Sequence, residues 1–228
     1  VSSDLSDALG FTGNVWVKDE THNVAGSHKA RHLFGILLHL VIAERTGRVP
    51  WGDDESRPPL AISSCGNAAI AASTLAAAGA VAAALARGLG EGGVSAPLVA
   101  VQTEGCAPLS RAWTRYRESS TEARDLAADW THYMWPWEHE PASLADGILD
   151  DETYDWVVDL REIERTGGRV VVAPEDVVRR AAELVPRSTG VEASPTGTAG
   201  VAGLVTEIDA GTLRGGDVLV VASGVVRR

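Results

Sequence analysis

Residues 15–31 read VWVKDETHNVAGSHKAR and contain both lysines of the chain, Lys18 and Lys29. The other 18 of the 20 basic side chains are arginine, so arginine serves wherever a general positive charge is needed. A guanidinium stays protonated, whereas an amine can lose its proton and form a Schiff base with a carbonyl group. The two lysines are therefore candidates for chemistry that arginine cannot perform. The alternative is two surface lysines kept by chance.

The residues around Lys29 predict a strand, a polar turn and a helix. Residues 15–17 are apolar and typical of a strand, and residues 28–45 form an apolar run of helical length. The hydroxyl of Ser27 can cap this helix, which places Lys29 in its first turn. There the helix dipole and the neighbouring apolar side chains both disfavour the ammonium form. The sequence thus predicts a neutral, nucleophilic amine.

This segment resembles pyridoxal-phosphate enzymes of the tryptophan synthase β type, known as fold type II. Their pattern K-x-E followed by G-S-x-K-x-R is matched by residues 18–20 and 26–31. The nearest relatives are threonine synthases, serine/threonine dehydratases and diaminopropionate ammonia-lyases. The resemblance implies pyridoxal 5'-phosphate as the cofactor, held by Lys29 as a Schiff base. It also implies that Lys29 is the catalytic residue. Once the substrate has freed Lys29 from the cofactor, the lysine amine moves the proton at Cα of the substrate.

A second motif follows an apolar run that ends at residue 62 and precedes an alanine-rich helix. A strand, a turn of small residues and a helix N-terminus together expose backbone amides that can bind an anion. In the family, a similar Ser-Gly-Asn loop binds the substrate carboxylate, and its asparagine contacts the ring oxygen of the cofactor. The resemblance assigns the cofactor contact to Asn67 and substrate binding to Ser63, Ser64, Cys65 and Gly66. The alternative is an ordinary strand-to-helix turn.

The rest of the chain predicts alternating strands and helices. Strands are expected within residues 100–109, 166–172 and 218–224, and a helix is expected to begin near residue 174. A second helix, with glycines at positions 197, 200 and 203, can pack closely on a sheet. Residues 143–148 resemble the family's S-x-A-x-G-I segment, whereas the aromatic stretch 130–139 predicts a loop to which we assign no chemistry.

The last of these strands ends at Ser223. Members of the family place a serine or threonine there, against the pyridine nitrogen of the cofactor. The resemblance therefore assigns Ser223 to cofactor binding. A neutral hydroxyl at this place leaves the nitrogen largely unprotonated, which favours β-elimination and replacement over transamination.

The expected fold is α/β, a three-layer open parallel sheet flanked by helices, tryptophan synthase β-like, with a truncated smaller lobe. Residues 1–228 are expected to form one such domain. Residues 13–78 supply the remaining smaller lobe, and residues 79–228 the larger lobe. Family members have a much longer segment where this chain has residues 79–97. In the family, this longer segment includes a glycine-rich loop that binds the phosphate of the cofactor. We expect that only Gly79 remains of this loop, and therefore that the cofactor binds weakly.

Composition excludes several classes of partner. The net charge of −11 argues against a nucleic-acid partner. Cys65 and Cys106 are the two cysteines and form no CxxC pair, which argues against a disulfide framework or a zinc site, so no metal is expected. The longest apolar run, residues 33–42, is too short to cross a bilayer. No signal peptide is visible, so a cytoplasmic protein is expected; because the chain begins with Val1 rather than Met, a missing N-terminal segment is expected too.

Three hypotheses for the function follow. The first is a pyridoxal-phosphate-dependent lyase that acts on a small amino acid by β-elimination or by β/γ-replacement, as a homodimer. The second is a shortened, non-catalytic remnant of that family with weak or no cofactor binding. The third is an unrelated α/β binding domain that shares these turns. The absorbance spectrum of the protein with added pyridoxal phosphate discriminates among them.

Overall fold

The computed structural model describes residues 2–22, 97–153, 156–222 and 224, together with isolated positions between residues 35 and 48. The chain divides into two compact units. The first consists of Val1–Asp19 with Val94–Arg228, and the second of Glu20–Gly93. All the strands of the described residues belong to the first unit. The lobe boundaries expected from the sequence, 13–78 and 79–228, stay a prediction.

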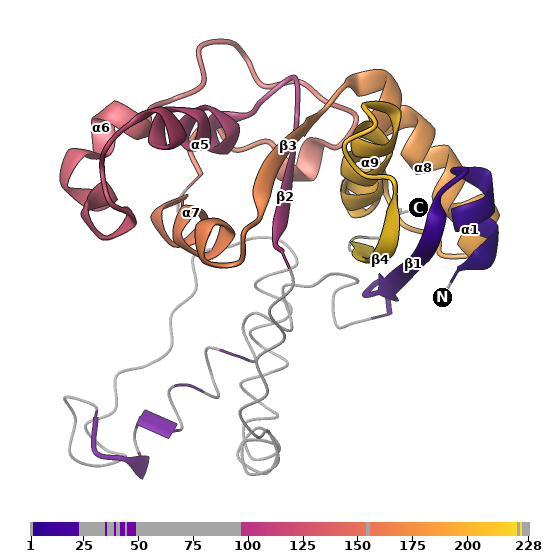
Figure 1. Ribbon diagram of the computed structural model, residues 1–228, viewed down its shortest axis with the longest axis horizontal. Coiled ribbons are helices and arrows are strands. Elements are labelled where there is room, and N and C mark those ends of the chain that lie inside the picture. The colour runs from indigo at the N-terminus through magenta and orange to yellow at the C-terminus, as the bar shows by residue number, and fades with distance from the viewer. Residues whose placement is uncertain are drawn as a thin grey trace. The chain divides into compact units, whose positions relative to one another are not determined.

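The described residues of the first unit form both helices and strands (Figure 1). In chain order the elements are α1 (Ser3–Ala8), β1 (Thr12–Asp19), β2 (Val99–Thr103), α5 (Pro108–Glu118), the 3₁₀ helix η2 (Ala123–Asp129), α6 (Trp130–Tyr133), the 3₁₀ helix η3 (Asp146–Ile148), α7 (Trp156–Arg165), β3 (Arg169–Ala173), α8 (Glu175–Thr189), α9 (Pro195–Asp209) and β4 (Gly215–Ala222). The strands predicted near residues 15, 100, 169 and 218 and the helix predicted near residue 174 are thereby confirmed.

The four described strands pair in parallel. β1 pairs with β4, from Thr12 beside Gly215 to Asp19 beside Ala222. β2 pairs with β3, from Val99 beside Arg169 to Thr103 beside Ala173. The predicted α/β class with parallel strands is confirmed, and within the described residues the strands form two separate pairs.

Helices cover both faces of the β2–β3 pair. α9 packs on one face, where Val101 joins a core formed mainly by α1, β1, α8, α9 and β4. α5 and α7 pack on the other face, where Ala100 and Val170 join a second core. Because successive side chains of a strand point to opposite faces, the neighbours Ala100 and Val101 serve different cores. This is a helix–sheet–helix arrangement in three layers.

Helix α9 reaches both strand pairs because its glycines allow close approach. A Cβ atom at Gly203 would overlap the side chain of Val101 in β2. A Cβ atom at Gly200 would lie 2.9 Å from Cγ1 of Val220 in β4. Ser194 caps the helix by accepting a hydrogen bond from the amide of Gly197. The close packing predicted from the glycine spacing is confirmed for Gly200 and Gly203.

The aromatic stretch expected as a loop is in part a core element. Residues 130–133 form α6, and Tyr133 is only 2% exposed. The rings of Tyr133 and Trp130 lie 5.7 and 5.3 Å from the ring of Trp156 in α7. The expectation of a loop was therefore wrong for these four residues, because α7, further along the chain, supplies the apolar surface on which Tyr133 is buried.

Candidate active site

The candidate site lies at the carboxyl ends of the parallel strands β2 and β3, where open α/β sheets bind their ligands. Glu104 follows β2 directly, and its amide donates to the carbonyl of Ala173 at the end of β3. Its carboxylate accepts a hydrogen bond of 2.9 Å from the amide of Glu175, the first residue of α8. Glu104 thus links the end of β2 to the start of α8 and satisfies an amide that the helix leaves free.

Residues 142–148 run across these strand ends. The amide of Leu144 donates to Oε2 of Glu175 at 3.1 Å, and the amide of Gly147 donates to Oγ1 of Thr196 at 3.0 Å. The same Thr196 hydroxyl lies 3.3 Å from Oδ1 of Asp146. These contacts join the starts of α8 and α9 through one backbone segment. We call the resulting surface the carboxyl edge and define it as residues 103–106, 142–148, 175 and 194–197.

A close backbone approach fixes the same segment on its other side. The Cα of Gly105 faces the carbonyl group of Ala142 so closely that a Cβ atom there would overlap its oxygen. Glycine is thus the residue that this packing requires. The carboxyl edge is therefore held by backbone contacts as well as by side-chain hydrogen bonds.

Strand β4 ends beside the first turn of α9. The amide of Ser194 donates to the carbonyl of Gly224 at 3.0 Å. Gly224 has φ of 98°, which L side chains rarely adopt, and a Cβ atom there would lie 3.0 Å from Oγ of Ser194. Gly224 therefore lies directly beside the N-cap of α9.

The carboxyl edge contains buried polar atoms that have no hydrogen-bond partner among the described residues. Among them, Oγ1 of Thr103 and Oε1 of Glu175 are buried and have no hydrogen-bond partner. Thr103 itself is 1% exposed. Buried polar atoms normally have a partner in a folded protein. These two atoms fit a polar ligand that donates hydrogen bonds, and the N-terminus of α9 beside Gly224 fits a phosphate group such as that of pyridoxal phosphate.

Cys106 in the carboxyl edge is not built as a nucleophile. It is 1% exposed, and its Sγ lies 3.2 Å from the carbonyl oxygen of Asp150, toward which the thiol donates. Burial raises the pKa of the Cys106 thiol, and the charges of Asp151 and Asp150 raise it further. The thiol therefore stays protonated and unreactive at neutral pH.

The part of the chain that the structure describes holds no group of three His, Cys, Asp or Glu side chains that could bind a metal ion.

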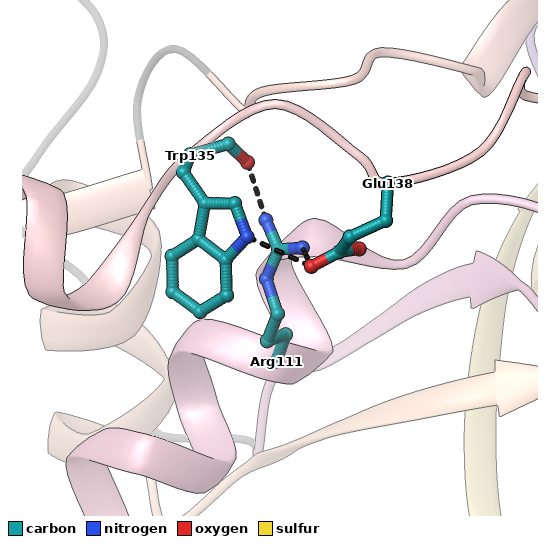
Figure 2. A network of polar contacts seen from close by, with 3 residues as sticks. All are labelled: Arg111, Trp135 and Glu138. Carbon is teal, nitrogen blue, oxygen red and sulfur yellow. Dashed lines mark hydrogen bonds and ion pairs between the residues drawn. The ribbon is translucent and has the colours of Figure 1, made fainter.

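Arg111 of α5 contacts the loop that follows α6 (Figure 2). Its guanidinium donates to Oε1 of Glu138 at 2.7 Å and to the backbone carbonyl of Trp135. The central guanidinium carbon lies 3.7 Å from the ring centroid of Trp135 and 5.3 Å from that of Trp137. We call this set, Arg111, Trp135, Trp137 and Glu138, the Arg111 clamp.

Neighbouring groups shift the pKa values of both charged residues of the Arg111 clamp. The indole Nε1 of Trp135 also donates to Oε1 of Glu138, at 2.8 Å. This hydrogen bond, helped by the Glu138 amide and the positive charge of Arg111, lowers the pKa of the Glu138 carboxyl. Burial lowers the pKa of Arg111, although Glu138 acts in the opposite direction. Because a guanidinium titrates far above neutral pH, both groups are ionised and form an ion pair at neutral pH.

The site residues predicted from the sequence lie outside the described residues. They are Lys29, Ser63, Ser64, Cys65, Gly66, Asn67, Gly79 and Ser223. Their roles stay predictions. Of the two lysines, Lys18 is described, is exposed, and stands beside Val221 in the β1–β4 register.

The structure adds residues that the sequence did not single out. Thr103, Glu175 and Thr196 were not singled out, and Glu104 was recognised only as part of a loop after a strand. A signal for two of them was present, because Glu175 and Thr196 each follow a proline at a predicted helix start. The Arg111 clamp left no such signal, since 27 residues separate Arg111 from Glu138 without a periodic pattern.

Comparison with solved structures shows which fold these elements build. The processed form of threonine deaminase isoform 2 from Solanum lycopersicum has a TM-score of 0.59 at 13% identity, covering 99% of this chain and 82% of that chain. Threonine deaminase from T.th. has a TM-score of 0.50 at 20% identity, covering 100% and 90%. Maize serine racemase has a TM-score of 0.50 at 14% identity, covering 100% and 88%. At these identities the likeness concerns the fold alone.

The sequence comparisons show the family. No curated protein sequence matches the chain. A family model described as pyridoxal-phosphate dependent enzyme matches residues 76–224, more than half of the chain. Gly79 and Ser223 fall inside the matched residues, and Lys29 and Asn67 precede them. The chain belongs to the family of pyridoxal-phosphate dependent enzymes, with the tryptophan synthase β-like fold and pyridoxal phosphate as its cofactor.

Proposed function

We propose that this protein is a lyase that acts on a small amino acid by β-elimination, or a related enzyme that performs β/γ-replacement. The observation that carries the proposal is the family match over residues 76–224, which includes the carboxyl edge. The names of two structural neighbours, threonine deaminase and serine racemase, support a small hydroxy amino acid as the substrate class. The unused polar atoms at Thr103 and Glu175 support a polar ligand at this edge.

Each residue of the predicted site receives a role in this proposal. Lys29 would hold the cofactor, and its amine would move the proton at Cα of the substrate. Asn67 and Ser223 would hold the cofactor ring, and the amide of Gly79 its phosphate. Ser63, Ser64, Cys65 and Gly66 would bind the substrate carboxylate. When bound, pyridoxal phosphate supplies an electron-withdrawing ring that stabilises negative charge at Cα.

The described residues provide the frame for that chemistry. Glu104 fixes the start of α8, and Thr196 fixes residues 146 and 147 against the start of α9. The carbonyl of Gly224 accepts a hydrogen bond from the amide of the N-cap Ser194. These hydrogen bonds hold the carboxyl edge in one geometry, which is what orientation of a reacting group requires.

The proposal predicts the products formed from candidate amino acids. With pyridoxal phosphate and serine, threonine or diaminopropionate, we expect keto acid and ammonia as the products, measured by coupled assays. A neutral hydroxyl at Ser223 favours elimination, so pyridoxamine phosphate should not accumulate. Conversion of the cofactor to pyridoxamine phosphate without elimination contradicts the proposal. Loss of all cofactor during dialysis, with no turnover, favours instead a shortened remnant of the family.

We also propose that the protein is a homodimer. Trp16, Leu219 and Val221 lie on one face of the β1–β4 pair and are 44, 66 and 45% exposed. Exposed apolar patches on a sheet commonly mark an interface, and a two-fold dimer buries the same patch twice. Sedimentation should therefore show a dimer for the native protein and a monomer for Leu219→Lys. Val158→Lys, at a 57% exposed position of α7, is the matched control and should remain dimeric.

A dimer of Leu219→Lys, or a monomer of the native protein, contradicts this assignment.

No described helix is both long enough and apolar enough to cross a bilayer. A cytoplasmic location stays a prediction.

A further inference from the structure

The Arg111 clamp has contacts that only arginine can make together. One guanidinium donates to the carboxylate of Glu138 and to the carbonyl of Trp135, while its central carbon lies 3.7 Å from the Trp135 ring centroid (Figure 2). A guanidinium is planar, has several N–H donors and has two flat faces that stack on aromatic rings, so it can make all three contacts at once. A lysine ammonium keeps the charge but has neither the fork nor the flat surface.

The clamp holds one end of an irregular segment. No helix or strand lies between α6, which ends at Tyr133, and η3, which begins at Asp146, and all of these residues are described. Contacts with other segments, from side chains and from the backbone at Gly105, therefore fix this stretch. Arg111 is 15% exposed and holds its beginning, because both backbone and side chain of Trp135 contribute to the clamp.

The other end of the segment is part of the carboxyl edge. Ala142 approaches Gly105, the amide of Leu144 donates to Glu175, and the amide of Gly147 donates to Thr196. Glu175 is also one of the two residues of this edge with an unused buried oxygen. The path from the clamp to the candidate site is thus a single short stretch of backbone without secondary structure of its own.

We propose that Arg111 is a positioning residue of this site, which fixes residues 142–148 and so maintains the wall of the amino-acid binding site. The inference rests on the proposed function for its kinetic part. Arg111 does not touch the reacting atoms in this proposal. It acts through Trp135 and Glu138 on the position of the Leu144 and Gly147 amides.

Hydrogen exchange of the full-length protein tests the structural part. In Arg111→Lys, exchange of the Leu144 and Gly147 amides should rise by about tenfold or more, because local opening becomes easier. Glu138→Gln, at a 49% exposed partner, should produce a smaller rise and guards against general misfolding of the Arg111 variant. Arg117→Lys is the matched control on the same helix and should leave both amides unchanged. Unchanged exchange at both amides in Arg111→Lys overturns the inference.

Steady-state kinetics test the functional part. We expect Arg111→Lys to raise KM for the amino acid about tenfold while kcat changes less than about threefold, as for loss of binding that the substrate and the transition state share. Faster exchange with unchanged KM overturns the role in the site. If the native protein turns over none of the amino acids, the proposed function fails, and the exchange rates alone then decide whether Arg111 holds the segment.

Discussion

Lys29→Ala is expected to abolish covalent attachment of pyridoxal phosphate. In the native protein, borohydride reduction after incubation with the cofactor should place the label on the peptide that contains Lys29. Without the amine no attachment forms, and turnover should fall by at least about a hundredfold, the lower range for a positioned proton-transfer group. Lys29→Arg should give the same result, since a guanidinium neither loses its proton nor forms an imine. Mass spectrometry of the reduced, digested protein measures the label.

The second lysine provides the control for this experiment. Lys18 lies in β1, is exposed and stands beside Val221 in the sheet register. Lys18→Ala should therefore keep the label on Lys29 and keep the turnover of the native protein. A label found on Lys18 or on the amino terminus alone would refute the assignment of Lys29.

The strands and the helices α8 and α9 could be predicted because each depends on local sequence. β3 is the valine-rich run 169–173, and α8 begins with two acidic residues and is followed by Gly190 in the left-handed conformation. The packing of α9 was also predictable, since glycines at positions 200 and 203 lie on one side of a helix and remove the side chains that would separate it from the strands.

The pairing of strands and the carboxyl edge could not be predicted in the same way. β1 and β4 lie near opposite ends of the chain, with Thr12 beside Gly215, and no local pattern encodes that partnership. The hydrogen bonds from Glu175 to Glu104 and from Gly147 to Thr196 join a backbone amide to a distant side chain. Such contacts depend on where the fold brings two segments together, which periodicity does not report.

The aromatic stretch illustrates how tertiary packing decides between two interpretations of one composition. Tyr133 and Trp135 are close neighbours in the chain, yet Tyr133 enters the core with Trp156, whereas Trp135 stacks on Arg111. The first environment comes from α7 and the second from α5. An aromatic residue followed by another gives no indication of either partner, so the sequence led to a single loop where the structure has a core helix and a clamp.

Gly105→Ala should destabilise the protein by about 1–3 kcal/mol, the usual cost of forcing an extra carbon into a packed interior. The new Cβ would overlap the carbonyl oxygen of Ala142, and because that oxygen belongs to the backbone, no side-chain rotation can relieve the overlap. Either the turn after β2 or residues 142–148 must move, and the carboxyl edge contains both. The free energy of unfolding, from urea denaturation followed by circular dichroism, measures the loss.

The same change at a glycine with open space separates this overlap from a general effect of alanine. Gly35 has no atom within 4 Å of an added Cβ and is helical. Gly35→Ala should therefore leave stability unchanged or raise it by up to about 1 kcal/mol, since alanine favours a helix. Equal stability of the two variants would show that residues 142–148 can yield to the added carbon. In that case the contact between Gly105 and Ala142 does not fix the carboxyl edge, and its geometry depends on the hydrogen bonds of Glu175 and Thr196 and on the Arg111 clamp.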